Sequence, residues 1–214
     1  NLVVLFRVLW RKVWLIISIP IIAMLVTFAL TWDMPDRYKS TAQLSTGYTT
    51  NEQILITNDP NSLRDINVKF NNLIETMKSE IILTLVSYRL VLHDLQDERP
   101  FRKLSKEKLA PFTQEDIDLV IKISKEKLEN MELLSSFDLN ERKVINFIGA
   151  CEYSSWQLVE DLQVVRIKDT DYIRIQYISE DPRLSAFVVN TLAEEIIRYD
   201  NKIKQSRSGQ SVTF

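Results

Sequence analysis

The sequence predicts an α+β protein, in which an N-terminal transmembrane helix is followed by a domain of a small β-sheet packed with long helices. Residues 13–32 contain no charged side chain. Two later regions alternate apolar and polar residues with the period of two that is typical of half-buried strands. Between and after them, apolar residues recur at intervals of three and four, which is typical of amphipathic helices. The 214 residues leave room for one outer domain of ordinary size.

The apolar segment 13–32 has the length of a membrane-spanning helix. A helix of about 20 residues at about 1.5 Å per residue crosses the hydrocarbon core of a bilayer. Its polar members are Ser18, Thr27 and Thr31, whose hydroxyl groups can bond back to carbonyls of the same helix. A buried core helix of this length rarely lacks every charge, and the apolar part of a signal peptide is shorter. We therefore predict a retained transmembrane helix.

The flanking charges predict its orientation. Arg7, Arg11 and Lys12 precede the segment without any acidic residue. Because positive residues favour the cytoplasmic side, residues 1–12 are expected to form a cytoplasmic or interfacial N-terminus. Residues 33–204 are then expected to form a domain outside the cytoplasm, which in a bacterium with two membranes is the periplasm.

Three segments are predicted to be strands. Residues 38–45 alternate as a half-buried strand directly after the membrane segment. Residues 162–167 and 172–178 flank the polar segment 168–171, which predicts an antiparallel hairpin.

The longest helical pattern covers residues 63–95 and predicts one helix of about 35 residues, capped by Asn61 or Ser62. Its first half is expected to be half exposed and its second half covered. The apolar arc along the whole of this helix is broad, and one small sheet is not expected to cover it fully. This arc favours contact with further copies of the chain.

Other helices are expected to begin at Thr113, Asp138 and Asp181, where capping signals precede apolar patterns. The helix after Asp181 is predicted to bury Leu184, Phe187, Val188, Leu192, Ile196 and Ile197. Residues 99–160 are interpreted as a helical insert, and the polar residues 205–214 as the truncated start of a continuation.

The inventory of residues excludes most enzyme classes. The net charge of -2 argues against nucleic-acid binding, and three scattered glycines cannot build a phosphate-binding loop. A single histidine, His93, and a single cysteine, Cys151, leave no zinc set and no disulfide. Cys151 is expected to be a buried small apolar residue, and His93, beside Asp94, to have a structural or exposed role.

The remaining charged residues are predicted to be solvated, so we predict no catalytic residue, no cofactor and no metal. These are the carboxylate pairs Glu194-Glu195 and Glu160-Asp161, the turn residues Asp169 and Asp171, and the interleaved face formed by Lys122, Lys125, Lys127, Glu126, Glu129 and Glu132.

Three motifs in this order resemble one family. The first, after the basic, Trp-containing N-terminus, contains Pro35, Tyr38, Ser40, Ala42 and Leu44. The second contains Ile74, Glu75, Met77, Lys78 and Ser79, and the third contains Ile173, Ile175, Tyr177, Ser179, Asp181 and Pro182, followed by Ala186 and Asn190. The chain resembles the Wzz-type chain-length determinants, or polysaccharide co-polymerases, of bacterial inner membranes. Residues 99–160 are not matched and are interpreted as a family-variable insert.

The resemblance implies a non-enzymatic inner-membrane scaffold whose periplasmic domains assemble into a ring. Such a scaffold would control the chain length of a surface polysaccharide (an exopolysaccharide, capsule or O-antigen), or assist its polymerisation and export. The implied partners are further copies of the chain, the polymerase or export machinery and the growing polysaccharide; no nucleic acid is expected. Some family members carry a cytoplasmic tyrosine kinase domain, but no nucleotide-binding loop occurs in this sequence.

An alternative interpretation is a membrane-anchored periplasmic ligand-binding or sensor domain. A second transmembrane helix after residue 214, preceded by long heptads, would favour the polysaccharide scaffold, whereas a signalling module would favour the sensor. An efflux-pump adaptor is less consistent with the sequence, because such adaptors are expected to be richer in strands and glycine.

Overall fold

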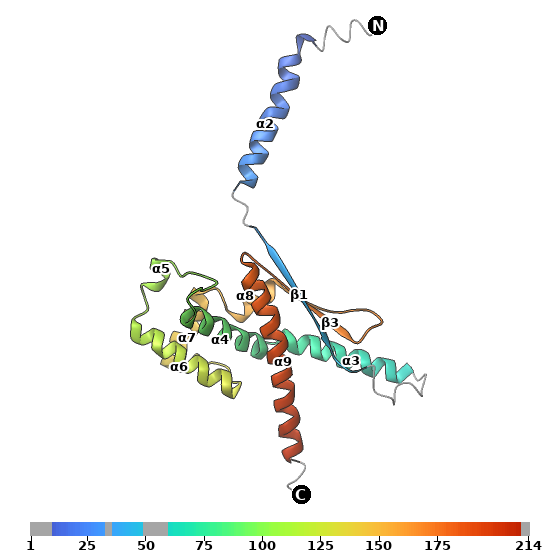
Figure 1. Ribbon diagram of the computed structural model, residues 1–214, viewed down its shortest axis with the longest axis vertical. Coiled ribbons are helices and arrows are strands. Elements are labelled where there is room, and N and C mark those ends of the chain that lie inside the picture. The colour runs from blue at the N-terminus through green and yellow to red at the C-terminus, as the bar shows by residue number, and fades with distance from the viewer. Residues whose placement is uncertain (1–9, 33–35, 49–59, 211–214) are drawn as a thin grey trace. The chain divides into compact units, whose positions relative to one another are not determined.

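The computed structural model describes residues 10–32, 36–48 and 60–210. The chain divides into two compact units, residues 1–36 and residues 37–214. The first unit contains helix α2 (Val13–Thr31), which has 19 residues and buries none of them. Figure 1 shows it as a single helix. The predicted helix is therefore confirmed, and it is the one helix of the described residues that is long and apolar enough to cross a membrane.

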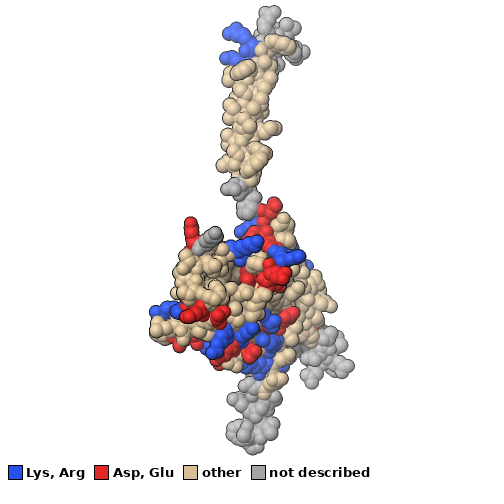
Figure 2. All heavy atoms as spheres, turned by 60° about the vertical axis from the view of Figure 1, so that its left-hand side comes forward, with Lys and Arg blue, Asp and Glu red and all other residues tan. Residues whose placement is uncertain are grey.

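The polar side chains of α2 are satisfied within the helix, as the sequence predicts. Ser18 donates to the carbonyl of Leu15 at 3.4 Å, and Thr27 donates to that of Ala23 at 2.8 Å. In Figure 2 the helix is free of charged atoms along its length, with basic side chains at its N-terminal end. Such a surface suits a hydrocarbon environment, in which unpaired polar groups are costly.

The second unit is built around a three-stranded antiparallel sheet in the order β1-β3-β2. The strands are β1 (Tyr38–Ser45), β2 (Leu162–Arg166) and β3 (Tyr172–Ser179). All three predicted strands are confirmed. β1 has the predicted bounds, and the ends of β2 and β3 each differ from the prediction by one residue. Within the described residues, β1 and β2 are the two edges of the sheet.

One face of the sheet is buried and the other faces outward. Val164, Ile173 and Ile175 are each no more than 2% exposed and belong to the core. Helices α9 and α3 pack on this sheet. Val165, whose side chain alternates to the opposite face, is 47% exposed. The period of two in the sequence therefore predicted the buried face correctly.

The predicted single helix over residues 63–95 is wrong, because the chain breaks there into α3 (Pro60–Met77) and α4 (Glu80–Gln96). Ser79 at the break is extended, with φ -66° and ψ 151°. Its hydroxyl donates to the carbonyl of Thr76 at 2.6 Å, so a side chain replaces the backbone donor that a continuous helix needs there.

The predicted caps, Asn61 and Ser62, are also wrong, because α3 begins at Pro60. Proline suits the first helical position, since it has no N–H to leave unpaired and its φ is already helical.

The two halves of this region differ in burial as predicted. On α3 the buried apolar side chains are Ile66, Phe70 and Met77, whereas α4 buries nine residues. Helices α6, α8 and α9 all pack on α4, so the second half of the predicted helix is covered by other elements, as predicted. The buried arc of α4 therefore gives no argument for oligomerisation.

The segment 99–160 forms a helical layer against α4. Its helices are α5 (Lys106–Leu109), α6 (Gln114–Asn130), α7 (Leu139–Ala150) and α8 (Ser155–Glu160). The predicted helix starts are confirmed: Thr113 forms a capping box with Asp116, and the carboxylate of Asp138 accepts from two backbone N–H groups. Phe147 and Leu158 from this layer are each 1% exposed and join the common core.

The last helix, α9 (Pro182–Gln210), starts after Asp181 as predicted. Its predicted buried stripe is correct for Leu184, Val188 and Ile196 but wrong for Ile197, which is 50% exposed. Ile197 lies off the stripe, because each residue turns the helix by about 100°. The neighbouring buried position on the stripe is occupied by Glu195.

Candidate functional site

The residues that carry the family resemblance meet where β1, β3 and α9 come together. In the register of the sheet Tyr38 lies opposite Ser179, and Ser40 lies opposite Tyr177. Two motifs that are more than a hundred residues apart in the sequence are therefore direct neighbours. Tyr177 is 2% exposed, and burial raises the pKa of its phenol to about 12. Its role here is packing.

Hydroxyl groups connect this sheet edge to the start of α9. The hydroxyl of Ser185 donates to the carbonyl of Tyr38 at 2.9 Å and lies 2.7 Å from the hydroxyl of Ser179. The hydroxyl of Ser179 in turn donates to the carbonyl of Asp181 at 2.7 Å. These contacts fix the angle at which α9 leaves the sheet.

Asp181 holds the first turn of α9. Its carboxylate accepts from the backbone N–H of Arg183 at 2.7 Å and from the guanidinium of Arg183 at 2.7 Å. The bond from the Arg183 side chain lowers the pKa of Asp181. Pro182 follows at the first helical position, so both residues predicted from the motif serve as the start of the helix.

The other motif residues do not join this junction. Ala42 and Leu44 are partly buried against the core. Glu75 and Asn190 are exposed, on α3 and α9, and Ser79 lies at the break between α3 and α4. Pro35 lies outside the described residues.

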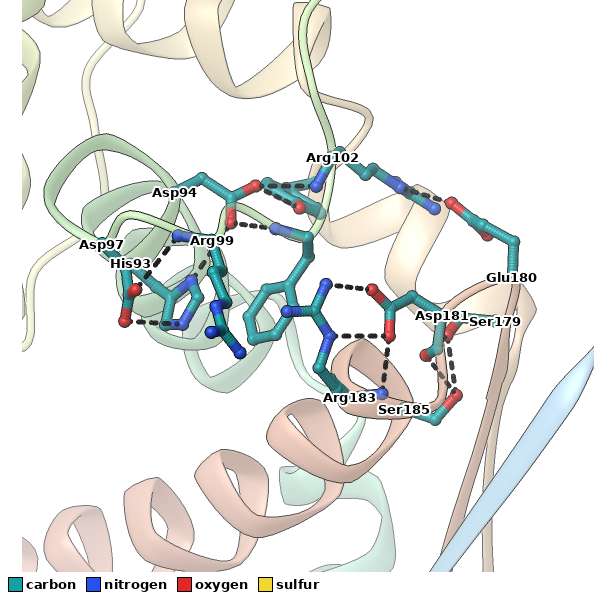
Figure 3. A network of polar contacts seen from close by, with 12 residues as sticks. His93, Asp94, Asp97, Arg99, Arg102, Ser179, Glu180, Asp181, Arg183 and Ser185 are labelled. Atoms are coloured by element: carbon teal, nitrogen blue, oxygen red, sulfur yellow. Dashed lines mark hydrogen bonds and ion pairs between the residues drawn. The ribbon is translucent and has the colours of Figure 1, made fainter.

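A second group of polar contacts surrounds Asp94, near the end of α4 (Figure 3). Its carboxylate accepts from the backbone N–H groups of Phe101 and Arg102 at 2.8 and 3.2 Å. It also accepts from the hydroxyl of Tyr153 at 2.6 Å. The Asp94 side chain is 8% exposed. One carboxylate therefore anchors both ends of the inserted segment to α4.

Arg102 carries this connection to the end of β3. Its Nε donates to Glu180 at 2.8 Å and its Nη1 donates to the carbonyl of Glu152 at 2.6 Å. Its guanidinium also lies 5.1 Å from the centre of the Tyr153 ring. The hydrogen bond from Arg102 lowers the pKa of Glu180. Figure 3 shows this arm reaching from the insert toward the junction of β3 and α9.

The single histidine and the single cysteine of the chain take part in packing. The His93 ring stacks on Phe101 with 4.0 Å between ring centres, and its nitrogens face Asp94 and Asp97 at 3.2 and 3.4 Å. Cys151 is 5% exposed, as predicted, and burial raises the pKa of its thiol to about 12. The thiol is therefore protonated and unreactive at neutral pH.

A buried carboxylate connects three helices. Glu195 on α9 is fully buried, and its Oε1 lies 2.8 Å from Nη2 of Arg89 on α4. Its Oε2 lies 2.9 Å from Nη2 of Arg198, which also donates to the carbonyl of Leu128 on α6 at 2.5 Å. The prediction that Glu195 is solvated is therefore wrong. Its place three residues after Leu192, on the buried stripe, was the signal in the sequence.

Two further charged residues were also predicted wrongly. The ammonium group of Lys127, only 17% exposed, contacts Glu132 at 3.2 Å and Glu141 at 3.0 Å, so it is held between α6 and α7. Asp171 accepts from the hydroxyl of Thr46 at 2.8 Å, which ties the hairpin turn to the end of β1. Glu141 and Thr46 lie on other elements, so the pattern along a single helix or turn did not reveal these contacts.

These contacts position helices and strands, and they do not assemble reactive groups. Within the described residues no three of the His, Cys, Asp and Glu side chains are grouped so as to hold a metal ion. The arrangement acts as a set of structural connections between the sheet, α4, α9 and the inserted layer.

The comparison with known protein families finds a match to the first part of the chain. Residues 1–90 match the Wzz chain length determinant protein family. The matched residues contain α2, β1, α3 and part of α4, and they include the first two motifs of the predicted resemblance, which is thereby confirmed. No curated protein and no solved structure matches the chain.

The Wzz family consists of membrane-associated polysaccharide co-polymerases that determine chain length without being enzymes. The third motif, at the junction of β3 and α9, lies outside the matched residues. Its pairing with the Wzz-matched strand β1 is a property of this structure.

The buried Glu195 generates a matched test with its neighbour. Replacing Glu195 by Ala leaves Arg89 and Arg198 without their shared partner. Because both side chains are about a third exposed, we expect the free energy of unfolding to fall by about 1–3 kcal/mol. Glu194 is exposed, so Glu194→Ala is expected to change it by less than about 0.5 kcal/mol. Urea titration of the intact chain in detergent, followed by circular dichroism, measures both. Equal effects of the two substitutions would contradict the buried ion cluster.

Proposed function

We propose that this protein is an inner-membrane scaffold that controls the chain length of a surface polysaccharide, or assists its polymerisation and export, by assembling into a ring. The observation that carries the proposal is the match of residues 1–90 to the Wzz family. The match includes both the membrane helix and the first strand of the outer domain. The polysaccharide concerned is an exopolysaccharide, a capsule or an O-antigen.

The proposed topology has residues 1–12 in the cytoplasm and the second unit in the periplasm. It is supported by the 19 residues of α2, none of which is buried against protein. Arg11 and Lys12 precede this helix. Its first turn contains no acidic residue, and its last turn contains no basic residue. Positive residues on the cytoplasmic side are the usual determinant of such an orientation.

Ring assembly is supported by the two edges of the sheet. Strands β1 and β2 are its outer strands, and within the described residues each has an edge without a strand partner. Unpaired edges on opposite sides of one sheet can meet head to tail in neighbouring copies, which produces a closed ring when the rotation between copies closes. Val165 adds an exposed apolar side chain on β2.

The contacts of the charged residues favour a scaffold over an enzyme. Asp94 accepts from the backbone N–H of Arg102, Arg102 donates to the carbonyl of Glu152, and Glu195 pairs with Arg198. Such a domain holds neighbouring copies in a fixed arrangement and places their surfaces beside a growing polysaccharide. We therefore propose that the partners are further copies of the chain, the polymerase or export machinery and the polysaccharide itself.

The topology is testable by labelling with a membrane-impermeant maleimide. Phe137 is 93% exposed, so Phe137→Cys is expected to react in intact spheroplasts. The buried Cys151 of the parent chain serves as the unreactive background, and Arg11→Cys is expected to react only after permeabilisation. Labelling of Phe137→Cys only after lysis would refute the periplasmic placement.

The function is testable by deleting the gene and resolving the surface polysaccharide by gel electrophoresis. We expect the distribution of chain lengths, or the amount of polymer, to change and to be restored by the wild-type gene. An unchanged distribution and amount in the deletion strain would overturn the proposed function.

The assembly is testable by light scattering of the detergent-solubilised chain. We expect an oligomer, and we expect Val165→Arg on β2 to lower its mass because a charge then occupies the edge strand. The control Lys125→Glu changes an exposed charge on α6 and is expected to leave the mass unchanged. A wild-type monomer at micromolar concentration would contradict the ring.

A further inference from the structure

A cleft of about 260 Å³ opens beside α4 on the side of the inserted layer. Its lining comes from α4, α7, the start of α8 and the segment before α7, and it includes Glu80, Thr84, Leu133, Ile145, Ser155 and Trp156. None of the residues used by the contacts around Asp94 or Glu195 forms its wall. The cleft is therefore separate from the connections described above.

Trp156 presents an exposed aromatic ring at this cleft. It is 62% exposed, although the nearby Tyr153 and Leu158 are 0% and 1% exposed. The backbone around it is fixed, because Ser154 and Gln157 form a capping box at the start of α8. The ring is thus held outward on a rigid support.

Several hydrogen-bonding groups of the cleft are free to bind a ligand. The hydroxyl of Ser87 is already used, since it bonds to the carbonyls of Leu83 and Tyr153. By contrast, Glu80, Thr84 and Ser155 make no side-chain hydrogen bond or ion pair with the described residues. Together with the indole N–H of Trp156, they offer donors and acceptors around an apolar surface.

The chemistry of this lining matches a sugar ring. One side of a sugar ring carries C–H groups that pack on an aromatic face, while its hydroxyls point outward to donors and acceptors. Leu133 and Ile145 are 42% and 36% exposed and extend the apolar floor. A purely apolar ligand would leave the carboxylate and hydroxyl groups unpaired, which is unfavourable.

The charge of the lining restricts the class of sugar. Among the described residues that line the cleft there is no Lys or Arg, and Glu80 is acidic. A phosphate, a nucleotide or a uronic acid would meet a like charge without any cation to compensate it. An uncharged sugar is the ligand class that these groups fit.

We propose that this cleft binds an uncharged sugar unit of the polysaccharide, with Trp156 as the stacking surface. The source of the sugar rests on the proposed function, whereas the site rests on the geometry. Binding there would give the scaffold a direct contact with the growing chain, on the layer of helices that α4 connects to the sheet.

The test uses the full chain in detergent with Trp10, Trp14 and Trp32 changed to Phe, so that Trp156 alone reports. The probes are oligosaccharides prepared by partial acid hydrolysis of the surface polysaccharide of cells that carry the gene, separated into neutral and acidic pools. We expect the neutral pool to change the Trp156 emission in a saturable way. We expect the acidic pool to bind at least tenfold more weakly, and Glu80→Gln to reduce that difference.

A matched pair of variants tests the role of the ring itself. In the otherwise wild-type chain, Trp156→Ala is expected to weaken binding of the neutral pool at least tenfold by calorimetry, because stacking on the indole is lost. The control Phe137→Ala removes an even more exposed aromatic ring that does not line the cleft and is expected to leave binding unchanged. Circular dichroism checks that both variants remain folded.

The outcomes separate this inference from the proposed function. Absence of binding by both pools, or equal binding by wild type and Trp156→Ala, overturns the sugar site. If gene deletion still changes the polysaccharide in that case, the scaffold function stands without the site. A loss of oligomer mass in Trp156→Ala without any sugar binding would identify the cleft as a contact between copies and would also overturn the proposal.

Discussion

A helix that is covered on nearly every side must find protein partners for its polar groups, and α4 is such a helix. It buries nine residues and is packed against α6, α8 and α9. Ser87 and the side chain of Asp94 are 1% and 8% exposed, so each bonds to another element, while Arg89 pairs with the fully buried Glu195 of α9. Those bonds determine where the surrounding layers lie, because a partner in the wrong place would leave a buried charge unpaired.

The three partners are on different parts of the chain, so α4 connects the structure. Ser87 reaches the carbonyl of Tyr153, at the end of the inserted layer. Arg89 reaches Glu195 on α9, which itself packs on the sheet. Asp94 holds both ends of the insert. The inserted layer is therefore not a loose appendage: its position relative to the sheet is fixed by bonds that pass through one helix.

The sequence predicted the helices and strands of this fold better than the hydrogen bonds and ion pairs that connect them. An uncharged run of residues located the membrane helix, periodicity located the strands, and the capping signal at Asp181 located the start of α9, because each of these features is local in the sequence. Periodicity failed at Ser79, where a local hydroxyl bond interrupts an otherwise continuous helical pattern. It failed again at Glu195 and Lys127, since each of them is also paired with a residue of another helix, Arg89 or Glu141, which the pattern along one helix does not reveal. Only the position of Glu195 on the apolar stripe of α9 could have indicated it.

The candidate sites show the same limit. The motif residues Tyr38, Ser179 and Asp181 were found in the sequence, but their meeting across the sheet depends on the register of β1 and β3. Trp156 stood out neither by periodicity nor by motif, because its significance lies in being a large aromatic side chain that stays 62% exposed beside the buried Tyr153 and Leu158.

The arrangement of these sites suggests how a scaffold without catalytic groups can respond to a polymer. Arg102 joins the insert to Glu180, which directly follows β3 and lies two residues before the start of α9. The cleft at Trp156 lies on the same inserted layer, which α4 holds against α9. The cleft and the sheet edges that are proposed to contact neighbouring copies therefore belong to one connected unit. Sugar binding is coupled to assembly if the cleft binds the sugar with different affinities in two arrangements of the ring. A ligand shifts the equilibrium between two arrangements by the difference between its affinities for them.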